Sequence, residues 1–301
     1  MIPSPKAVFV LVHGGWHDHS SWARVVSLLE AHGCAAWAPD LPGAGVHARA
    51  PGALSARPFD AVAFAAERSP VAHVTQEERT QAVVALVREA ASLSPAKVIL
   101  VGHSAGGMTV SAVAEQVPQL LLAVVYLAGF LVPAGMPLLS VLQHPSMSAA
   151  LAPGLFVGDA ALIGATRIQP RSEDPAYRAR LKAAFYGDVS ESEFAQAAAR
   201  LHCDESNAGA LALSEISAPR FGTVPRHYIR CTEDRAIPLA AQDHMIAVLD
   251  AAIGNLTTTH TLRSSHSPFL SQPAQLSRIL MEVYGHGLPR PAPAAPGGGA
   301  P

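Results

Sequence analysis

The sequence is poor in charged residues and has no long hydrophobic run, and both shortages exclude classes of protein. Only 15% of its 301 residues are charged, and the formal net charge is -2. Domains that bind nucleic acid or anionic membranes concentrate Lys and Arg, and this sequence has no such run, so neither partner is expected. The longest apolar stretch, around Leu120 to Val132, is shorter than a membrane span requires.

Cysteine is also scarce. Cys34, Cys203 and Cys231 are widely spaced, with no CxxC pair and no zinc-type spacing. Free thiols in odd number are typical of a reducing compartment. The first residues, Met1 to Lys6, are too few and too polar to form a secretory signal. A cytoplasmic location is therefore predicted.

What the sequence does contain is a regular alternation of apolar β-rich runs and helical patterns. Half of the residues are hydrophobic, which is enough for a substantial core. Strands are expected at residues 8–12, 35–38, 97–101, 121–127, 226–231 and 257–262. Repeated strand–helix alternation predicts an α/β fold with a mostly parallel, doubly wound sheet.

Between residues 132 and 218 the pattern changes. Strand signals stop, and short helical pieces rich in Leu, Ala, Met and Phe are interrupted by prolines. We interpret residues 132–218 as a helical cap inserted between two parts of the core, residues 1–131 and 219–286. The remaining Pro/Ala/Gly tail, residues 287–301, is expected to be disordered.

The pentapeptide GHSAG at residues 102–106 lies directly between the clearest strand and a helix. The pattern G-x-S-x-G is weak alone, and a plain glycine-rich turn is the alternative. The strand–turn–helix context strengthens it, because small flanking residues permit the tight turn that raises a serine hydroxyl above the sheet. Ser104 is thus the candidate nucleophile, and the amide of Ala105, at a helix N-terminus, is one candidate oxyanion donor.

A serine nucleophile needs a base, and the base needs a carboxylate that orients it. Both should follow late strands, at the carboxyl edge of the sheet where open α/β folds build their sites. His266 follows the last expected strand, whereas His260 lies inside that strand and cannot readily reach the edge. The carboxylate is either Glu233 or Asp234, which follow the preceding strand.

The second oxyanion donor is expected in the loop after the first strand, HGGW at residues 13–16. Small residues there let the backbone approach a substrate closely, and we assign the role to the amide of Gly15, with a simple turn as the alternative. Losing one such donor typically costs on the order of 3 kcal/mol of transition-state stabilisation.

Three histidines, His13, His17 and His19, lie close together in this loop, and a metal site is the alternative they raise. Only Asp18 is a nearby carboxylate, and the spacing does not match a zinc signature, so no metal is expected. His13 is expected to pack or hydrogen-bond within the loop, and the other two are expected to be solvated.

Three stretches together resemble the plant methylesterase and hydroxynitrile lyase subfamily of the α/β hydrolases, with its bacterial carboxylesterase relatives. They are FVLVHGG at residues 9–15, VILVGHSAGGM at 98–108 and, most specific, CTEDRAIP at 231–238. The resemblance covers residues 7–127 and 225–284. It implies an α/β-hydrolase fold with a helical cap, no cofactor, and Asp234 as the acid of a triad with Ser104 and His266.

The subfamily contains both esterases and lyases, and two positions favour an esterase. The lyases carry a threonine after the loop histidine and a lysine after the catalytic histidine, where this sequence has Gly14 and Ser267. Without a cation beside His266, a departing cyanide would lack its charge partner. Hydroxynitrile lyase-type C–C cleavage and a ligand receptor on the hydrolase scaffold stay open as alternatives.

The predicted function is therefore a serine carboxylesterase that hydrolyses small apolar esters through an acyl-enzyme. The expected partner is a small-molecule ester, and a homodimer is left open. Substrate-binding positions are expected at Gly14, Trp16, His103 and Ser267. The candidate pocket walls, each of which would serve equally as plain core, are Trp16, Met136, Leu138, Leu142 and Phe156.

Overall fold

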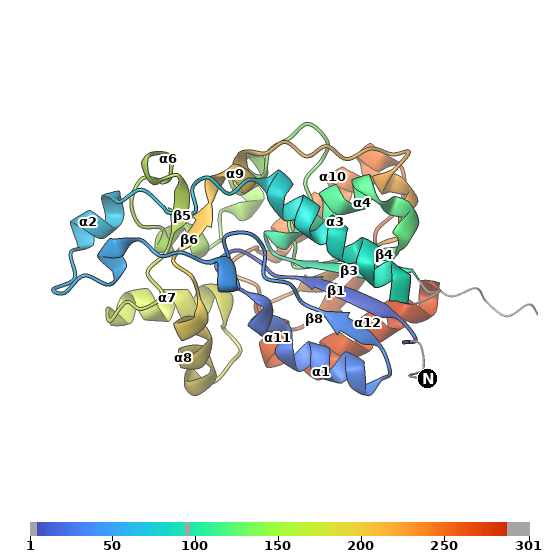
Figure 1. Cartoon of the computed structure of the whole chain (residues 1–301), viewed down its shortest axis with the longest axis horizontal. Coiled ribbons are helices and arrows are strands. Elements are labelled where there is room, and N and C mark those ends of the chain that lie inside the picture. Colours follow the sequence, from blue (N-terminus) through green and yellow to red (C-terminus); the bar gives the residue numbers. More distant parts are fainter. Residues whose placement is uncertain (1–4, 94–96, 288–301) are drawn as a thin grey trace, which may run out of the picture.

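The centre of the molecule is a six-stranded sheet in a computed structural model that describes residues 5–93 and 97–287 (Figure 1). The strand order is β2-β1-β3-β4-β7-β8, and every neighbouring pair is parallel. The strands are β1 (Val8–Val12), β2 (Ala35–Trp37), β3 (Val98–His103), β4 (Leu121–Leu127), β7 (Arg226–Cys231) and β8 (Thr258–Leu262). The predicted doubly wound, parallel sheet is confirmed.

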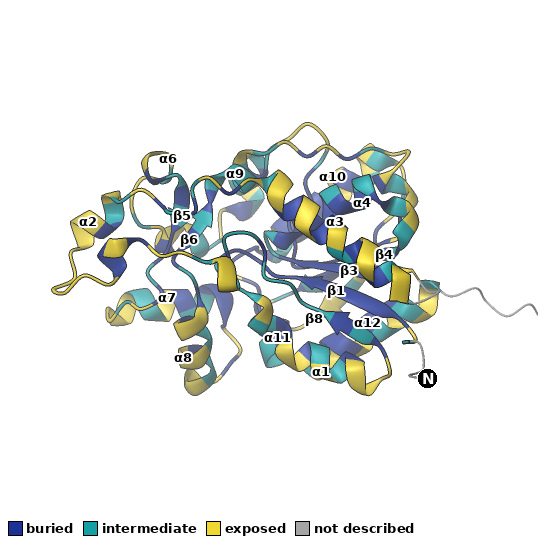
Figure 2. Cartoon of the chain, in the orientation of Figure 1, coloured by how far each residue is buried: buried dark blue, intermediate teal, exposed yellow. Residues whose placement is uncertain are grey.

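Helices cover both faces of this sheet, so β1 and β3 are buried throughout and β4 at every residue except Leu122 (Figure 2). Alternate side chains of β1 enter two separate apolar layers, because successive residues of a strand point to opposite faces. One layer contains α1 (Ala23–Ala31) and α12 (Pro273–Gly287). The other contains α3 (Gln76–Leu93), α4 (Gly106–Gln116) and α10 (Leu239–Ile253).

A cap of short elements lies beyond the carboxyl ends of the central strands (Figure 1). Its elements are α5 (Leu138–Leu142), α6 (Ala160–Ile163), β5 (Ala165–Arg167), α7 (Pro175–Phe185), α8 (Glu191–Arg200), β6 (Asp204–Ser206) and α9 (Asn207–Leu211). The expectation of a cap without strands is wrong, because β5 and β6 pair as a small antiparallel sheet. Strands this short show no periodic pattern, and α7 and α8 separate them in the sequence.

An earlier stretch of the chain packs against the cap. Figure 1 shows α2 (Ala61–Ala66) beside β5, β6 and α6. Arg167 of β5 donates hydrogen bonds to the backbone carbonyls of Phe64 and Glu67 and forms an ion pair with Asp204 of β6. Two separate stretches of chain therefore cover the carboxyl edge of the sheet.

The C-terminal part of the core ends with α11 (Pro268–Ser271) and α12. The tail expected at residues 287–301 lies outside the described residues, except for Gly287, which ends α12. None of the helices in the described ranges has the length and hydropathy of a membrane-spanning segment.

Candidate active site

Ser104 occupies a sharp turn between β3 and α4, at the carboxyl end of a central strand. Its φ angle of 51° lies in the left-handed region, which costs a non-glycine residue about 1–3 kcal/mol. The surroundings enforce this conformation: Phe130 N–H donates to Ser104 O at 2.9 Å, and a Cβ at Gly106 would lie 2.6 Å from His13 O. The turn therefore presents the serine side chain at the edge of the sheet that faces the cap.

Asp234 and His266 meet at the same edge. His266 Nδ1 donates to Asp234 Oδ2 at 2.7 Å, and both side chains are buried. The amides of Ala236 and Ile237 donate to Asp234 Oδ1 at 2.7 and 2.9 Å. Because Nδ1 of the imidazole donates its N–H to the carboxylate, the neutral ring presents Nε2 as its proton acceptor.

The two competing residues lie elsewhere. The carboxylate of Glu233 pairs with Arg263 at 2.7 Å on the protein surface. His260 lies within β8 and contacts His227 of the neighbouring strand. Of these two carboxylates it is Asp234, the one that the family resemblance implies, that bonds His266.

Gly15 and Ala105 line the same cavity as Ser104, as the oxyanion prediction requires. The loop that carries Gly15 is held by His13, whose Nδ1 donates to Gly14 O at 2.9 Å and whose Nε2 accepts from Leu41 N–H at 3.2 Å. Burial lowers the pKa of His13 and keeps its ring neutral, as these two roles require. Because the carbonyl of the Gly14–Gly15 peptide is held, the Gly15 N–H at its other side has a fixed direction.

His17 holds the next peptide of this loop. Its Nδ1 donates to Gly15 O at 2.7 Å, and its Nε2 accepts from the hydroxyl of Tyr186 at 2.8 Å. The expectation that His17 is solvated is wrong, because the cap covers it and leaves 5% of the residue exposed. Burial lowers the pKa of His17 to about 3. His19, by contrast, is exposed and pairs with Asp40.

The cavity at Ser104 is mainly apolar. Its larger apolar lining residues are Trp16, Met108, Phe130, Leu138, Leu142, Met147, Phe156, Phe185 and Ile237. Four of the five expected wall residues are among them, and the fifth, Met136, lies outside the lining and is 41% exposed. The sequence interpretation missed a polar section formed by Gln76, Arg79 and Glu205, because no motif links α3 to a three-residue cap strand.

Three of the four expected substrate-binding residues do not line this cavity. Gly14 packs against the nucleophile, since a Cβ there would lie 2.7 Å from Ser104 Cβ. His103 is buried and its Nε2 donates to the backbone oxygen of His266 at 2.9 Å. Ser267 is fully buried, and its hydroxyl has no hydrogen-bond partner among the described residues. Gly14 and His103 thus contact Ser104 and His266, Ser267 follows His266 in the chain, and only Trp16 of the four lines the cavity.

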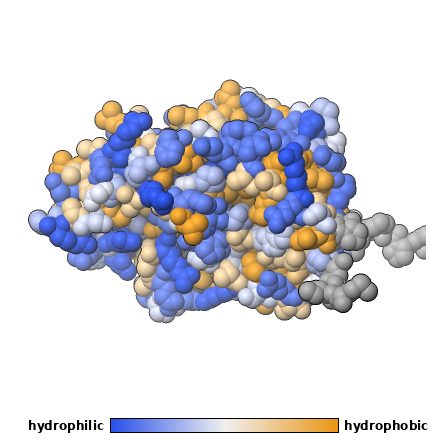
Figure 3. Space-filling model, viewed as in Figure 1, coloured by the Kyte–Doolittle hydropathy of each residue, from blue (hydrophilic) through white to orange (hydrophobic). Residues whose placement is uncertain are grey.

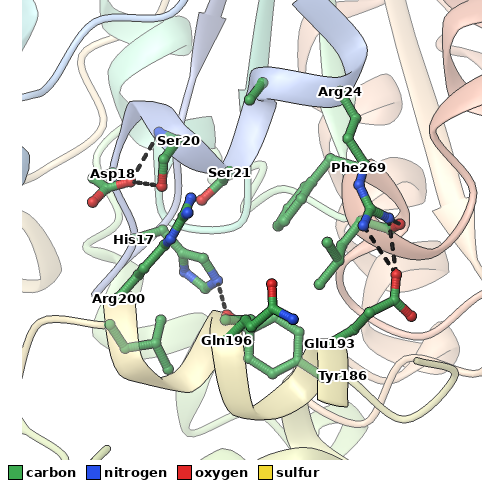
Figure 4. Close-up of a pocket in the computed structure, with 14 residues that line it drawn as sticks. His17, Asp18, Ser20, Ser21, Arg24, Tyr186, Glu193, Gln196, Arg200 and Phe269 are labelled. Carbon is green, nitrogen blue, oxygen red and sulfur yellow. Dashed lines mark hydrogen bonds and ion pairs between the residues drawn. The ribbon is translucent and has the colours of Figure 1, made fainter. Parts of the chain in front are cut away.

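A second cavity lies on the other side of the oxyanion loop (Figure 4). Figure 4 shows His17 hydrogen-bonded to Tyr186 at its wall, and Arg24 paired with Glu193 across it. Trp16 and Phe185, which directly precede His17 and Tyr186 in the sequence, line the cavity at Ser104 instead. The loop and the end of α7 thus form a wall between two cavities. No group of three or more His, Cys, Asp or Glu side chains in the described part of the chain could hold a metal ion.

The chain is similar to known proteins in sequence and in structure. The model of the Alpha/beta hydrolase family matches residues 9–279. Salicylic acid-binding protein 2 of Nicotiana tabacum is 27% identical, with 91% of this chain and 96% of the relative covered. Methylesterase 1 of Arabidopsis thaliana is 26% identical, with 92% and 96% covered. The resemblance to plant methylesterases that the three motifs indicate is confirmed.

Other relatives are longer than this chain. The putative chloroplastic methylesterase 15 of Arabidopsis thaliana is 27% identical, and the match spans 91% of this chain but 56% of the relative. Among solved structures, a pyrethroid hydrolase from Sphingobium faniae superposes with a TM-score of 0.71 at 21% identity, covering 93% and 97% of the two chains. Polyneuridine aldehyde esterase gives a TM-score of 0.66 at 22% identity, covering 92% and 98%. At these identities the two structures establish the fold.

Proposed function

Because the chain belongs to the alpha/beta hydrolase family, we propose that it is a serine carboxylesterase that acts on small, largely apolar esters. One observation carries the proposal: Ser104 lines a mainly apolar cavity with Gly15 and Ala105, at the sheet edge where Asp234 orients His266. A nucleophile, an oxyanion site and an oriented base are the parts that acyl transfer needs. The relatives named as methylesterases support an ester as the substrate class.

In the proposed mechanism, His266 Nε2 removes the hydroxyl proton of Ser104 as the oxygen attacks the ester carbonyl carbon. The negative charge that develops on the carbonyl oxygen is stabilised by the N–H groups of Gly15 and Ala105. Asp234 stabilises the imidazolium. The intermediate then collapses: the bond to the alkoxy oxygen breaks, and His266 gives its proton to the leaving alcohol.

The acyl-enzyme is then hydrolysed with the help of the same catalytic groups. A water molecule loses a proton to His266 while it attacks the acyl carbon, and the second oxyanion occupies the same two amides. When this intermediate collapses, the proton returns to the oxygen of Ser104 and the carboxylic acid leaves.

Hydrolysis of p-nitrophenyl acetate, butyrate and octanoate by the wild-type protein and by Ser104→Ala tests this proposal. Activity should fall with acyl length, and Ser104→Ala should lose at least about 10⁴-fold in kcat. Ser27→Ala, which changes an exposed serine of α1, is the matched control and should keep full activity. Full activity in Ser104→Ala would show that Ser104 is not the nucleophile.

Inactivity of the folded wild-type protein on all three esters would contradict the esterase proposal. Cyanide release from an aromatic cyanohydrin would then favour the lyase. Tight ligand binding without turnover would favour the receptor.

A further inference from the structure

The cavity at Ser104 contains an ion pair that its apolar lining does not explain. Arg79 projects from α3 in the core and Glu205 from β6 in the cap, and their side chains form an ion pair. The two side chains are 8% and 17% exposed, and both line the cavity. Removing two charges from water in this way is costly, and apolar residues of similar size would often be as stable. Stability alone therefore gives no reason for a charged pair at this wall.

Glu205 lies directly against the oxyanion loop. Its Oε2 accepts the Trp16 N–H at 3.4 Å, and a Cβ at Gly15 would lie 3.5 Å from Glu205 Cγ. The carboxylate therefore lies against the loop whose Gly15 amide is the proposed oxyanion donor. At 3.4 Å the bond to Trp16 is at the long limit, so Oε2 can accept a shorter bond from a ligand.

Arg79 and Gln76 complete this polar section of the wall. Arg79 uses one N–H for Pro42 O at 3.2 Å and another for Glu205, and a guanidinium has five. Gln76, one helical turn before Arg79, donates through Nε2 to Thr109 Oγ1 at 2.9 Å, which leaves its Oε1 as an acceptor. The section thus offers an acceptor on Glu205 and donors on Arg79 at one place.

We infer that this section binds a hydroxyl group on the carbon next to the ester carbonyl, so that the preferred substrates are esters of 2-hydroxy carboxylic acids. This inference rests on the proposed esterase function and names the substrate class of the same site. A hydroxyl can donate to Glu205 while it accepts from Arg79. A carboxylate substituent would face Glu205, and an ammonium would face Arg79, so each would meet a like charge.

An apolar substituent at that carbon forms no hydrogen bond with the remaining acceptor of Glu205 or the remaining N–H groups of Arg79. It removes water from the charged groups and returns no hydrogen bond, which is the arrangement by which a polar site rejects an isostere that lacks the hydroxyl. The pair therefore discriminates between substrates of equal size.

Two esters of equal size test the inference. Ethyl 2-hydroxybutyrate and ethyl 2-methylbutyrate differ by a hydroxyl in place of a methyl group, and their rates of alkaline hydrolysis correct for intrinsic reactivity. After this correction, kcat/KM should favour the hydroxy ester by about 10- to 100-fold, as a hydrogen bond to a charged group allows. Ethyl 2-methoxybutyrate, which keeps a hydrogen-bond acceptor and lacks the donor, should behave like ethyl 2-methylbutyrate.

The double variant Arg79→Met/Glu205→Leu removes the ion pair and leaves an apolar wall of similar volume. The ratio of its corrected kcat/KM values for the two esters should fall to unity or favour ethyl 2-methylbutyrate. Arg24→Met/Glu193→Gln is the matched control, because it removes another ion pair between core and cap that does not line the cavity at Ser104. The control should keep the wild-type ratio.

Two outcomes would overturn the inference: no preference in the wild-type protein, or an equal fall on both esters in the double variant. The second would mean that Glu205 only holds Trp16 and the oxyanion loop. If the wild-type protein hydrolysed no ester, the proposed function would fail separately. Calorimetric titration of Ser104→Ala with both esters then decides: tighter binding of the hydroxy ester supports the hydroxyl site, and equal binding refutes it.

Discussion

At the scale of single residues, the oxyanion loop depends on buried histidines that stay neutral. His13 and His17 each donate through Nδ1 to a loop carbonyl and accept through Nε2. A protonated ring could not accept, so the lowered pKa values that burial gives both rings are part of how they hold the loop. The direction of the Gly15 N–H thus depends on the bond from His13 to Gly14 O and on the bond from His17 to Gly15 O.

Tyr186→Phe tests the outer bond of this arrangement. The variant removes the donor to His17 Nε2 and leaves a buried ring nitrogen without a partner, which typically costs about 1–3 kcal/mol of stability. Because His17 holds the Gly15 carbonyl, we expect kcat to fall as well. Urea unfolding and steady-state kinetics measure the two effects.

Tyr177→Phe is the control for that variant. Its hydroxyl makes two hydrogen bonds within the cap, to Leu155 O and from Gln169 N–H, and neither touches the oxyanion loop. It should lose comparable stability and keep its kcat. An unchanged kcat in Tyr186→Phe would show that His17 does not govern the oxyanion loop.

Gly14→Ala tests how closely the loop approaches the nucleophile. The added Cβ would lie 2.7 Å from Ser104 Cβ and 2.8 Å from His103 Nδ1, so the loop or the turn at Ser104 must shift. A displacement of this kind should lower kcat by about 100-fold, as misplacement of catalytic groups does. Kinetics on p-nitrophenyl acetate provide the measurement.

Gly285→Ala in α12 is the matched control, because a Cβ there meets nothing within 4 Å. It should leave kcat unchanged and raise stability by about 0.5–1 kcal/mol, since alanine favours helix. Wild-type kcat in Gly14→Ala would mean that the loop tolerates the methyl group and is not tightly packed on Ser104.

At the scale of elements, the cap is organised around the β5–β6 pair. Arg167 and Asp204 face each other across it with 0% and 1% of their side chains exposed, joined by bonds of 2.6 and 2.7 Å. Arg167 also donates to the backbone of the stretch that contains α2. One guanidinium thus joins both stretches that cover the catalytic edge, and the next residue after Asp204 is Glu205 of the cavity wall.

Asp204→Ala should lower the free energy of unfolding by about 3–5 kcal/mol, because it leaves a buried guanidinium without its carboxylate. Urea unfolding followed by circular dichroism measures the change. Glu191→Ala is the control: it removes the pair with Lys182, in which Glu191 is 80% exposed, and should cost at most about 1 kcal/mol. Equal losses in the two variants would show that the buried pair does not hold the cap together.

At the scale of the whole molecule, buried histidines make stability depend on pH. His17 has a pKa of about 3 in the folded protein against 6.5 when unfolded. Between these values the unfolded chain binds a proton that the native protein does not, so stability falls as the pH falls. For His17 the loss between pH 7 and pH 5 is about 2 kcal/mol. His13 and His103, whose pKa values burial also lowers, add to it in the same direction.

Urea unfolding at pH 7, 6 and 5 measures this dependence, at pH values where most carboxylates are ionised. The midpoint should fall at each step. A free energy of unfolding that stays constant from pH 7 to pH 5 would contradict the burial of these rings in their neutral form.

On the face shown in Figure 3, hydrophobic residues are scattered among hydrophilic ones rather than gathered in one broad patch. Single exposed apolar residues are normal for folded proteins. The cytoplasmic location stays a prediction from the cysteine usage and the polar first residues, and a homodimer stays open.

The sequence by itself determined the core of this protein. Continuous apolar runs such as Val8–Val12 specify buried parallel strands, and the stretch from Gly102 to Gly106 specifies a turn that few residue types tolerate. Both signals are local, so each can be recognised without knowing what packs against it. The positions of Ser104 and His266 at strand ends followed from the same local order.

Only the tertiary structure decided what surrounds these residues. It showed that His17 is buried under Tyr186, and that Gly14, His103 and Ser267 lie outside the lining of the cavity at Ser104. It also brought Arg79 and Glu205 together from positions 126 residues apart. Contacts of this kind depend on how the cap folds onto the core, and no local pattern records which side chains meet there.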